Sequence, residues 1–71
     1  MNEHQELAIL ALHELRGDDL RRARAAFRDC TPEQMNGLYG QSGLTRNAIL
    51  RGYEEHSARC DAAIKWVRSA K

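Results

Sequence analysis

Histidine and cysteine are the residues of this 71-residue chain whose side chains could ligate a metal or act as a nucleophile. His56 and Cys60 are four residues apart, a spacing that places two zinc ligands on one helix face. Cys30 and His13 could complete a tetrahedral set. The same spacing is typical of a hydrogen-bonded histidine and a small buried thiol in a helical core. Because no paired motif such as two CxxC knuckles accompanies it, we expect no metal and no cofactor.

Catalysis by a thiol or by paired carboxylates is not favoured by these spacings. A Cys and a His within one helix lack the exposed, base-activated turn that a thiol nucleophile usually requires. Side chains that are adjacent on a helix diverge, and this applies to both acidic pairs, Asp18 with Asp19 and Glu54 with Glu55. The sequence also contains no glycine-rich phosphate loop. We therefore predict that the protein is not an enzyme.

Arginine provides the stronger candidate for a binding surface. Arg21, Arg24 and Arg28 are separated by three and four residues, so they form one stripe along a helix. Such a stripe could bind an acidic protein face or a nucleic acid, or it could be a solvated face paired with neighbouring acids. Charge-assisted contacts contribute about 1.5 to 3 kcal/mol each when desolvated. The predicted partner-binding surface combines this stripe with residues of the last helix, Arg46, Asn47 and Arg51.

The segment from residue 31 to residue 55 suggests an alternative function, DNA binding by a helix-turn-helix. Gly40 falls where the turn glycine of this motif would lie. The candidate recognition helix carries polar side chains that could contact base edges, namely Thr45, Arg46, Asn47 and Arg51. However, Asn36 occupies a position where the motif usually has a small apolar residue. The formal net charge of only +1 also provides little attraction for phosphates.

The composition favours a small helical protein, and the lack of an Arg-rich or apolar targeting segment favours the cytoplasm. With 42% hydrophobic and 30% charged residues, the chain is ordinary for a soluble globular domain. It contains ten Ala but only three Ile, one Val and two Thr, whereas β-sheets are rich in β-branched residues. Its longest apolar run, residues 7–12, is too short to span a bilayer. Without a secretory signal, the two cysteines are expected to be reduced thiols.

Caps and apolar spacing predict four helices, at about residues 3–16, 19–30, 32–39 and 46–69. Gly17 is expected to end the first helix in the left-handed αL conformation, and Asp18 to cap the second. The segment Thr31–Gln34 predicts a capping box with proline at the first helical position. Thr45 is expected to cap the last helix, within which Gly52 indicates a close approach by another backbone. The predicted fold is a single all-α domain, a small bundle or a long helical hairpin.

Apolar residues cover more than half of the circumference of the first helix, and this predicts a homodimer. We expect one face to be buried, consisting of Leu7, Leu10, Ala11 and Leu15, with Ile9 and Leu12 widening it. A helix this apolar contacts a partner as well as its own core, and a 71-residue chain builds only a marginal core.

Three further stripes are expected to complete the core. The second helix should bury Leu20, Ala23, Phe27 and Cys30, and the short third helix Met35, Leu38 and Tyr39. The last helix should bury a seam near heptad spacing, formed by Ile49, Tyr53, His56, Cys60, Ile64 and Val67, with Leu50, Ala63 and Trp66 beside it.

The stretch from residue 31 to residue 67, TPEQMNGLYGQSGLTRNAILRGYEEHSARCDAAIKWV, resembles the short helical accessory proteins of temperate phages and prophages. The resemblance covers about half of the chain and assigns no roles to individual residues. It implies a small stable protein that binds a host protein, in a class that includes inhibitors of bacterial defence systems and regulators of transcription. We therefore expect a non-catalytic protein that occludes a host protein.

Overall fold

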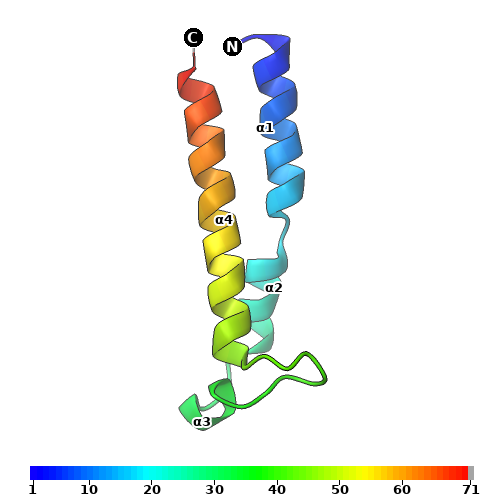
Figure 1. Ribbon diagram of the computed structural model, residues 1–71, viewed down its shortest axis with the longest axis vertical. Coiled ribbons are helices and arrows are strands. Elements are labelled where there is room, and N and C mark those ends of the chain that lie inside the picture. The colour runs from blue at the N-terminus through cyan, green and yellow to red at the C-terminus, as the bar shows by residue number, and fades with distance from the viewer. Residues whose placement is uncertain (71) are drawn as a thin grey trace. The chain divides into compact units, whose positions relative to one another are not determined.

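The computed structural model of the protein describes residues 1–70. Over this range every regular element is a helix: α1 (Glu3–Arg16), α2 (Asp19–Ala26), α3 (Pro32–Met35) and α4 (Arg46–Ser69) (Figure 1). The predicted all-α fold with a long C-terminal helix is therefore confirmed. The 24 residues of α4 correspond to about 36 Å at 1.5 Å per residue.

The chain forms two compact units that share α4. Unit 1 consists of Met1–Gly17 with residues 55–70, and unit 2 is Asp18–Glu54. In unit 1, α1 runs antiparallel to the C-terminal part of α4 (Figure 1). Unit 2 contains α2, α3 and the first part of α4.

Local capping fixes most helix starts as the sequence predicts. Thr31 and Gln34 form the expected capping box, and Pro32 occupies the first position of α3. The Oγ1 atom of Thr45 accepts a hydrogen bond of 3.0 Å from the backbone N–H of Ala48, as an N-cap does. Asp18 occupies the N-cap position of α2, but its side chain makes no capping hydrogen bond. All four predicted starts coincide with the observed ones. At α3 and α4 this is because the capping hydrogen bonds involve only residues close in sequence.

Both short helices end earlier than their apolar spacing predicts. The second ends at Ala26, where Phe27 is the C-cap, and a turn then connects the Cys30 N–H to the Phe27 carbonyl. The third ends at Met35, because the chain turns back to form an antiparallel bridge between Leu38 and Thr45. Leu38 is therefore 63% exposed and not part of the core.

The two helical stretches of unit 1 cap each other's C-terminal ends. The side-chain Nε2 of Gln5 donates to the carbonyl oxygens of Val67, at 3.1 Å, and Ala70, at 2.6 Å. At the other end, His56 Nε2 lies 2.8 Å from the Leu15 carbonyl oxygen. The last carbonyls of a helix have no partner within it, so these bonds satisfy the Ala70 and Leu15 carbonyls, while the Val67 carbonyl also accepts from the Ala70 N–H. Gln5 also closes a capping box with Asn2 at the start of α1.

The buried side of α1 differs from the predicted one. Ile9 is buried, whereas Leu7, Leu10 and Leu15 are 63–64% exposed. In unit 1 only one other helix packs against α1, and one neighbour covers one side of a helix. Ala11, also expected inside, is exposed as well.

The seam of α4 is confirmed at Cys60 and Ile64, which are buried, but not at His56. Ser57 is buried in place of His56, whose residue is exposed. The shift follows from the cap on α1, because His56 must lie at the edge of the contact to reach the Leu15 carbonyl.

The αL conformation predicted for Gly17 and the close backbone approach predicted at Gly52 are both absent. Gly17 ends α1 with the expected positive φ of 60°, although its ψ of −164° lies outside the αL region. At Gly52, a Cβ atom would have no neighbour within 4 Å. The predicted close approach of another backbone is therefore absent, and this face of α4 is open.

Candidate partner-binding surface

An arginine enclosed by aromatic rings organises unit 2. The rings of Phe27 and Tyr39 pack edge to face, with centroids 5.1 Å apart. The guanidinium of Arg46 lies 5.9 Å from the Phe27 centroid and 5.3 Å from that of Tyr39, within the range of cation–π attraction. Its Nη1 also donates to the Gln34 carbonyl oxygen at 2.9 Å. Arg46, one of the predicted binding residues, thus connects α3, α4 and the intervening loop.

The same aromatic rings form one side of a cleft of about 220 Å³ in unit 2. Its lining combines aromatic and aliphatic side chains with one acid and one base: Phe27, Tyr39, Ile49, Tyr53, Ala23, Ala26, Asp19 and Arg22. Because α2, α4 and the loop before α4 all contribute, the cleft exists only once these elements are packed. It presents an apolar surface with a guanidinium beside it.

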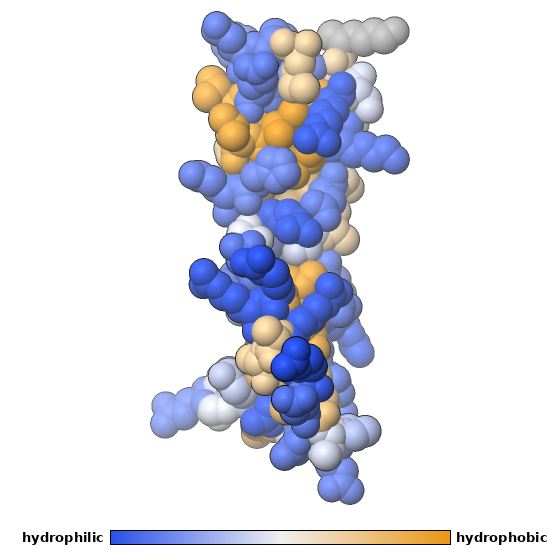
Figure 2. Space-filling model, turned by 180° about the vertical axis from the view of Figure 1, so that it is seen from behind, coloured by the Kyte–Doolittle hydropathy of each residue, from blue (hydrophilic) through white to orange (hydrophobic). Residues whose placement is uncertain are grey.

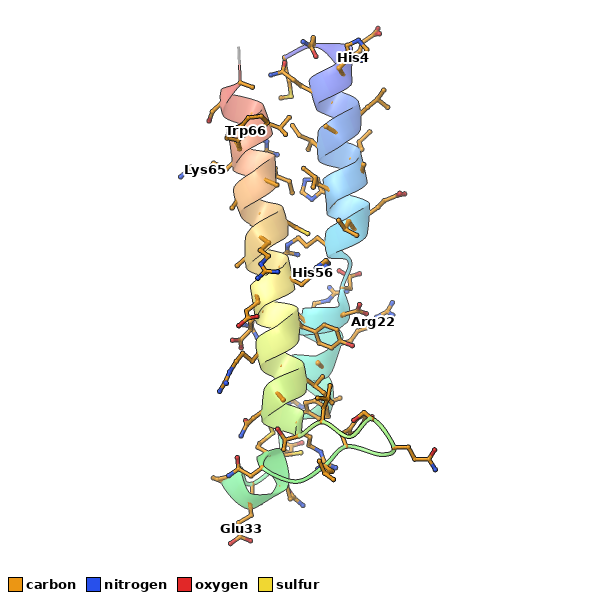
Figure 3. All side chains as sticks on the ribbon, in the orientation of Figure 1. His4, Arg22, Glu33, His56, Lys65 and Trp66 are labelled. Atoms are coloured by element: carbon orange, nitrogen blue, oxygen red, sulfur yellow. The ribbon has the colours of Figure 1, made fainter. Side chains whose placement is uncertain are left out.

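Arg22 is the arginine of α2 that lines this cleft (Figure 3). Within residues 1–70 it forms no ion pair with any acid. Arg22 lies next to Ala23 and Ala26, whose small side chains leave space at the helix surface. This neighbourhood is the sequence signal that could have indicated a cleft at Arg22. The sequence prediction nevertheless did not include Arg22 among the binding residues, because the aromatic side chains opposite it come from distant positions.

The three arginines predicted to form a stripe all lie at the surface of α2 or just after it. Arg21 is 3.5 Å from Asp18, Arg24 is 3.7 Å from Glu54, and Arg28 is 4.0 Å from Asp29. All six side chains are more than half exposed. Exposed pairs of this kind contribute only about 0.2 to 1 kcal/mol, so an acidic partner could replace the internal acids at small cost.

The polar side chains at the start of α4 contact their own chain. Thr45 caps the helix, Arg46 lies against the aromatic rings, and the Asn47 amide donates to Asn36 Oδ1 at 2.7 Å. Arg51 is exposed. Of the four residues considered for base contacts, three are thus engaged in internal hydrogen bonds or stacking.

The connection that precedes α4 is also unlike that of a helix-turn-helix. Ten residues, 36–45, separate the end of α3 from the start of α4, whereas the turn of that motif has three or four. In addition, α3 has only four residues. The Leu38–Thr45 bridge and the hydrogen bond from the Tyr39 N–H to the Leu44 carbonyl define this loop instead.

Two of the candidate metal ligands, His56 and Cys60, contact other groups of unit 1. The Leu15 carbonyl can only accept a hydrogen bond, so Nε2 of His56 carries a proton and donates to it. Cys60 Sγ lies 3.9 Å from that same nitrogen and is buried. Over residues 1–70, no group of three or more His, Cys, Asp or Glu side chains is arranged to hold a metal ion.

No known protein family, curated protein or solved structure matches this chain significantly. Among the helices of residues 1–70, none has both the length and the hydropathy required to cross a membrane.

Proposed function

We propose that this protein is a non-catalytic binding protein that occludes the surface of another protein through unit 2. The observation that carries this proposal is the aromatic cleft with Arg22 beside it. Aromatic residues and arginine are enriched at protein interfaces and dominate their binding energy. At about 220 Å³, the cleft is smaller than typical small-molecule pockets of roughly 300 to 1,000 Å³. Its size suits an apolar side chain of a partner protein.

The charges around the cleft define the partner surface that would fit. Arg22 would pair with a carboxylate next to the inserted apolar side chain, and the arginine stripe of α2 would extend the contact over an acidic surface. Arg21, Arg24 and Arg28 would exchange weak internal ion pairs for contacts desolvated by the partner, which are stronger. The expected partner is therefore an acidic protein surface with a protruding apolar residue.

The resemblance to phage accessory proteins suggests where such a partner is found. It supports a host protein in the cytoplasm, such as a component of a defence system or of the transcription machinery. Binding to that protein would inhibit or regulate it by blocking its surface, without any chemical reaction.

Capture of a bacterial protein by the tagged chain tests this proposal when surface variants are included. Arg22→Glu reverses the charge at the cleft, and Ala26→Gln fills part of it from an exposed position. We expect both variants to lose a protein that the wild type retains, and to bind the purified partner at least about tenfold more weakly. Arg59→Glu is the matched control, since it makes the same charge change at an exposed position of unit 1.

Equal capture by all four proteins, or no specific capture, would contradict the proposal. A mobility-shift assay with genomic DNA fragments at moderate salt examines the alternative function. A sequence-specific shift that is lost in Arg51→Ala, without a protein partner, would replace protein binding with DNA binding.

A further inference from the structure

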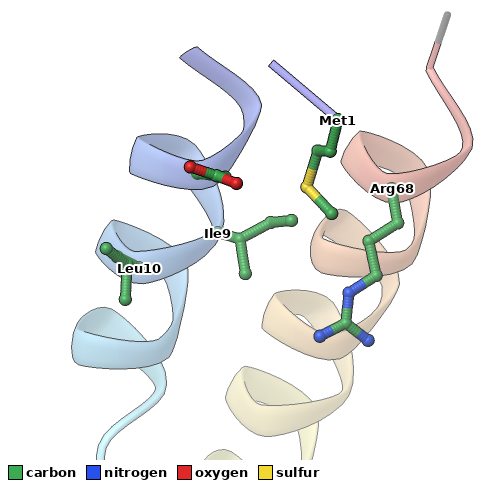
Figure 4. A pocket seen from close by; sticks show the side chains of 5 residues that line it. Met1, Ile9, Leu10 and Arg68 are labelled. Carbon is green, nitrogen blue, oxygen red and sulfur yellow. The ribbon is translucent and has the colours of Figure 1, made fainter. Parts of the chain in front are cut away.

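A second cleft, of about 310 Å³, lies between the two helical stretches of unit 1 (Figure 4). Met1, Ile9 and Leu10 provide its apolar lining, Glu6 belongs to its α1 wall and Arg68 to its α4 wall. Met1 is 70% exposed and Leu10 63%, although both are large apolar residues. Apolar side chains gather on this face of the molecule near the ends of the chain (Figure 2).

The cleft is open because unit 1 has only two helical stretches. Two helices bury the seam between them, but the groove along the outside of that seam requires further helices to fill it. The core of the unit is correspondingly small: its buried side chains are Ile9, Ser57, Cys60 and Ile64, and none is less than 2% exposed. Covering the cleft would therefore add substantially to the apolar surface that the unit buries.

The two charged residues of the cleft lie on opposite walls and are not paired. Glu6 comes from the first turn of α1 and Arg68 from the last turn of α4. Within residues 1–70, neither forms an ion pair with the other or with any other side chain. Each is thus available to an opposite charge on whatever covers the apolar floor.

We propose that a second copy of this chain covers this cleft, forming a homodimer through unit 1. The two-fold axis runs parallel to the helices, so that α1 of each copy packs against α4 of the other. Because Glu6 and Arg68 line one cleft on its two walls, this symmetry places Glu6 opposite Arg68 of the partner subunit, and Arg68 opposite Glu6 of the partner subunit. The floor residues Ile9 and Leu10 meet their counterparts between these two ion pairs.

Charge complementarity is the reason for choosing a second copy as the occupant. A two-fold interface must be self-complementary, in that residue i contacts residue j and j contacts i. An acid on one wall and a base on the other satisfy this condition, whereas a cleft with one sign of charge would repel its own copy. The four helical segments then form an arrangement of the four-helix type, in which the apolar grooves face each other.

This dimer involves unit 1 only and is independent of the partner surface proposed for unit 2. Sedimentation over a range of protein concentrations tests it directly. We expect the wild type to pass from monomer to dimer with increasing concentration. Glu6→Arg alone and Arg68→Glu alone each create two like-charge contacts, and each should weaken dimerisation by roughly a hundredfold.

Mixing the two single variants gives the decisive measurement. In the mixed dimer, Arg at position 6 of one chain faces Glu at position 68 of the other, and the remaining contact retains the natural pair. We expect a heterodimer in native mass spectrometry, where the two chains differ in mass, although each variant alone is monomeric. Arg59→Glu, which changes an exposed residue of α4 that does not line the cleft, should dimerise like the wild type.

Circular dichroism of each variant verifies that its helices are intact. A wild type that is monomeric at all concentrations would overturn the proposal, as would single variants that dimerise normally or fail to associate when mixed. A monomeric wild type that retains an apolar small molecule would assign the cleft to that ligand instead.

Discussion

Unit 1 pairs two long helical stretches whose ends cap each other, whereas unit 2 packs short elements around two aromatic rings and an arginine. In unit 1, Gln5 and His56 satisfy the helix ends through contacts between residues far apart in sequence. In unit 2, Thr31 and Thr45 cap their helices locally, and Phe27 provides the buried side chain around which the elements meet. Distant hydrogen bonds between helix ends thus order unit 1, whereas local caps and an aromatic centre order unit 2, and each unit retains an open cleft.

The two units also differ in the reason why large apolar residues are exposed. In unit 1, large residues such as Leu10 and Trp66, which is 74% exposed, lie outside a two-helix contact that cannot cover them. In unit 2, Tyr39 is partly exposed because it lines a cleft and also contacts Arg46. The first pattern is the basis of the proposed homodimer, and the second is the basis of the proposed partner surface.

Truncation of the buried Phe27 ring should destabilise the protein far more than truncation of an exposed apolar residue of unit 2. Phe27→Ala should lower the free energy of unfolding by about 3 to 5 kcal/mol, because a buried ring is removed and a cavity remains. Urea denaturation measures this loss. Hydrogen exchange should show the earliest loss of protection within residues 18–54. Leu38→Ala, at an exposed apolar position, should change stability by less than about 0.5 kcal/mol.

The helix pair of unit 1 buries two large apolar side chains, Ile9 and Ile64. Ile64→Ala should cost about 2 to 4 kcal/mol in urea denaturation, since Ile64 is 5% exposed. Leu15→Ala, by contrast, should be nearly neutral, because the structure places Leu15 outside the contact with α4. If Leu15→Ala were the more damaging of the two, the buried side of α1 would be the one that its leucine spacing predicts.

Gln5 and Gln34 each close a capping box, but only Gln5 also bonds to a distant helix end, so the same substitution at both positions isolates the distant bonds. Gln5→Glu keeps the box at the start of α1 but removes both hydrogen bonds to the end of α4 and brings a negative charge near its carbonyls. We expect a loss of about 1 to 3 kcal/mol. Gln34→Glu keeps the corresponding box of α3, where the side chain has no such distant contact, and should leave the urea midpoint within experimental error.

The smallest effect should be stabilising. Gly52→Ala adds a Cβ where nothing lies within 4 Å and removes a flexible residue from the interior of α4. Thermal denaturation should show a gain of about 0.5 to 1 kcal/mol. The same change at Gly43, where φ is +72°, should destabilise the protein by about 1 kcal/mol, because alanine is strained in that conformation. A loss at Gly52 would indicate an unrecognised close contact on this face.

The helical class, the extent of α1 and α4, and the capping of α3 and α4 are all predictable from the sequence alone. These features depend on residues within about four positions of each other, as with Thr31 and Gln34 or Thr45 and Ala48. Local hydrogen bonds and backbone preferences act in the same way whatever the rest of the chain does.

Tertiary packing, in contrast, selects which face of α1 is buried and which polar side chains have no partner within the described residues. Ile9 and Leu10 are both apolar, and the choice between them depends on where a single neighbouring helix lies. Arg46 has the chemistry of a binding residue, yet it lies against Phe27 and Tyr39 once the loop before α4 closes. Arg22 became the candidate binding residue for the same reason, because distant segments built a cleft beside it. Periodicity describes the sides of a helix, but which side is covered depends on the packing of segments far apart in the chain.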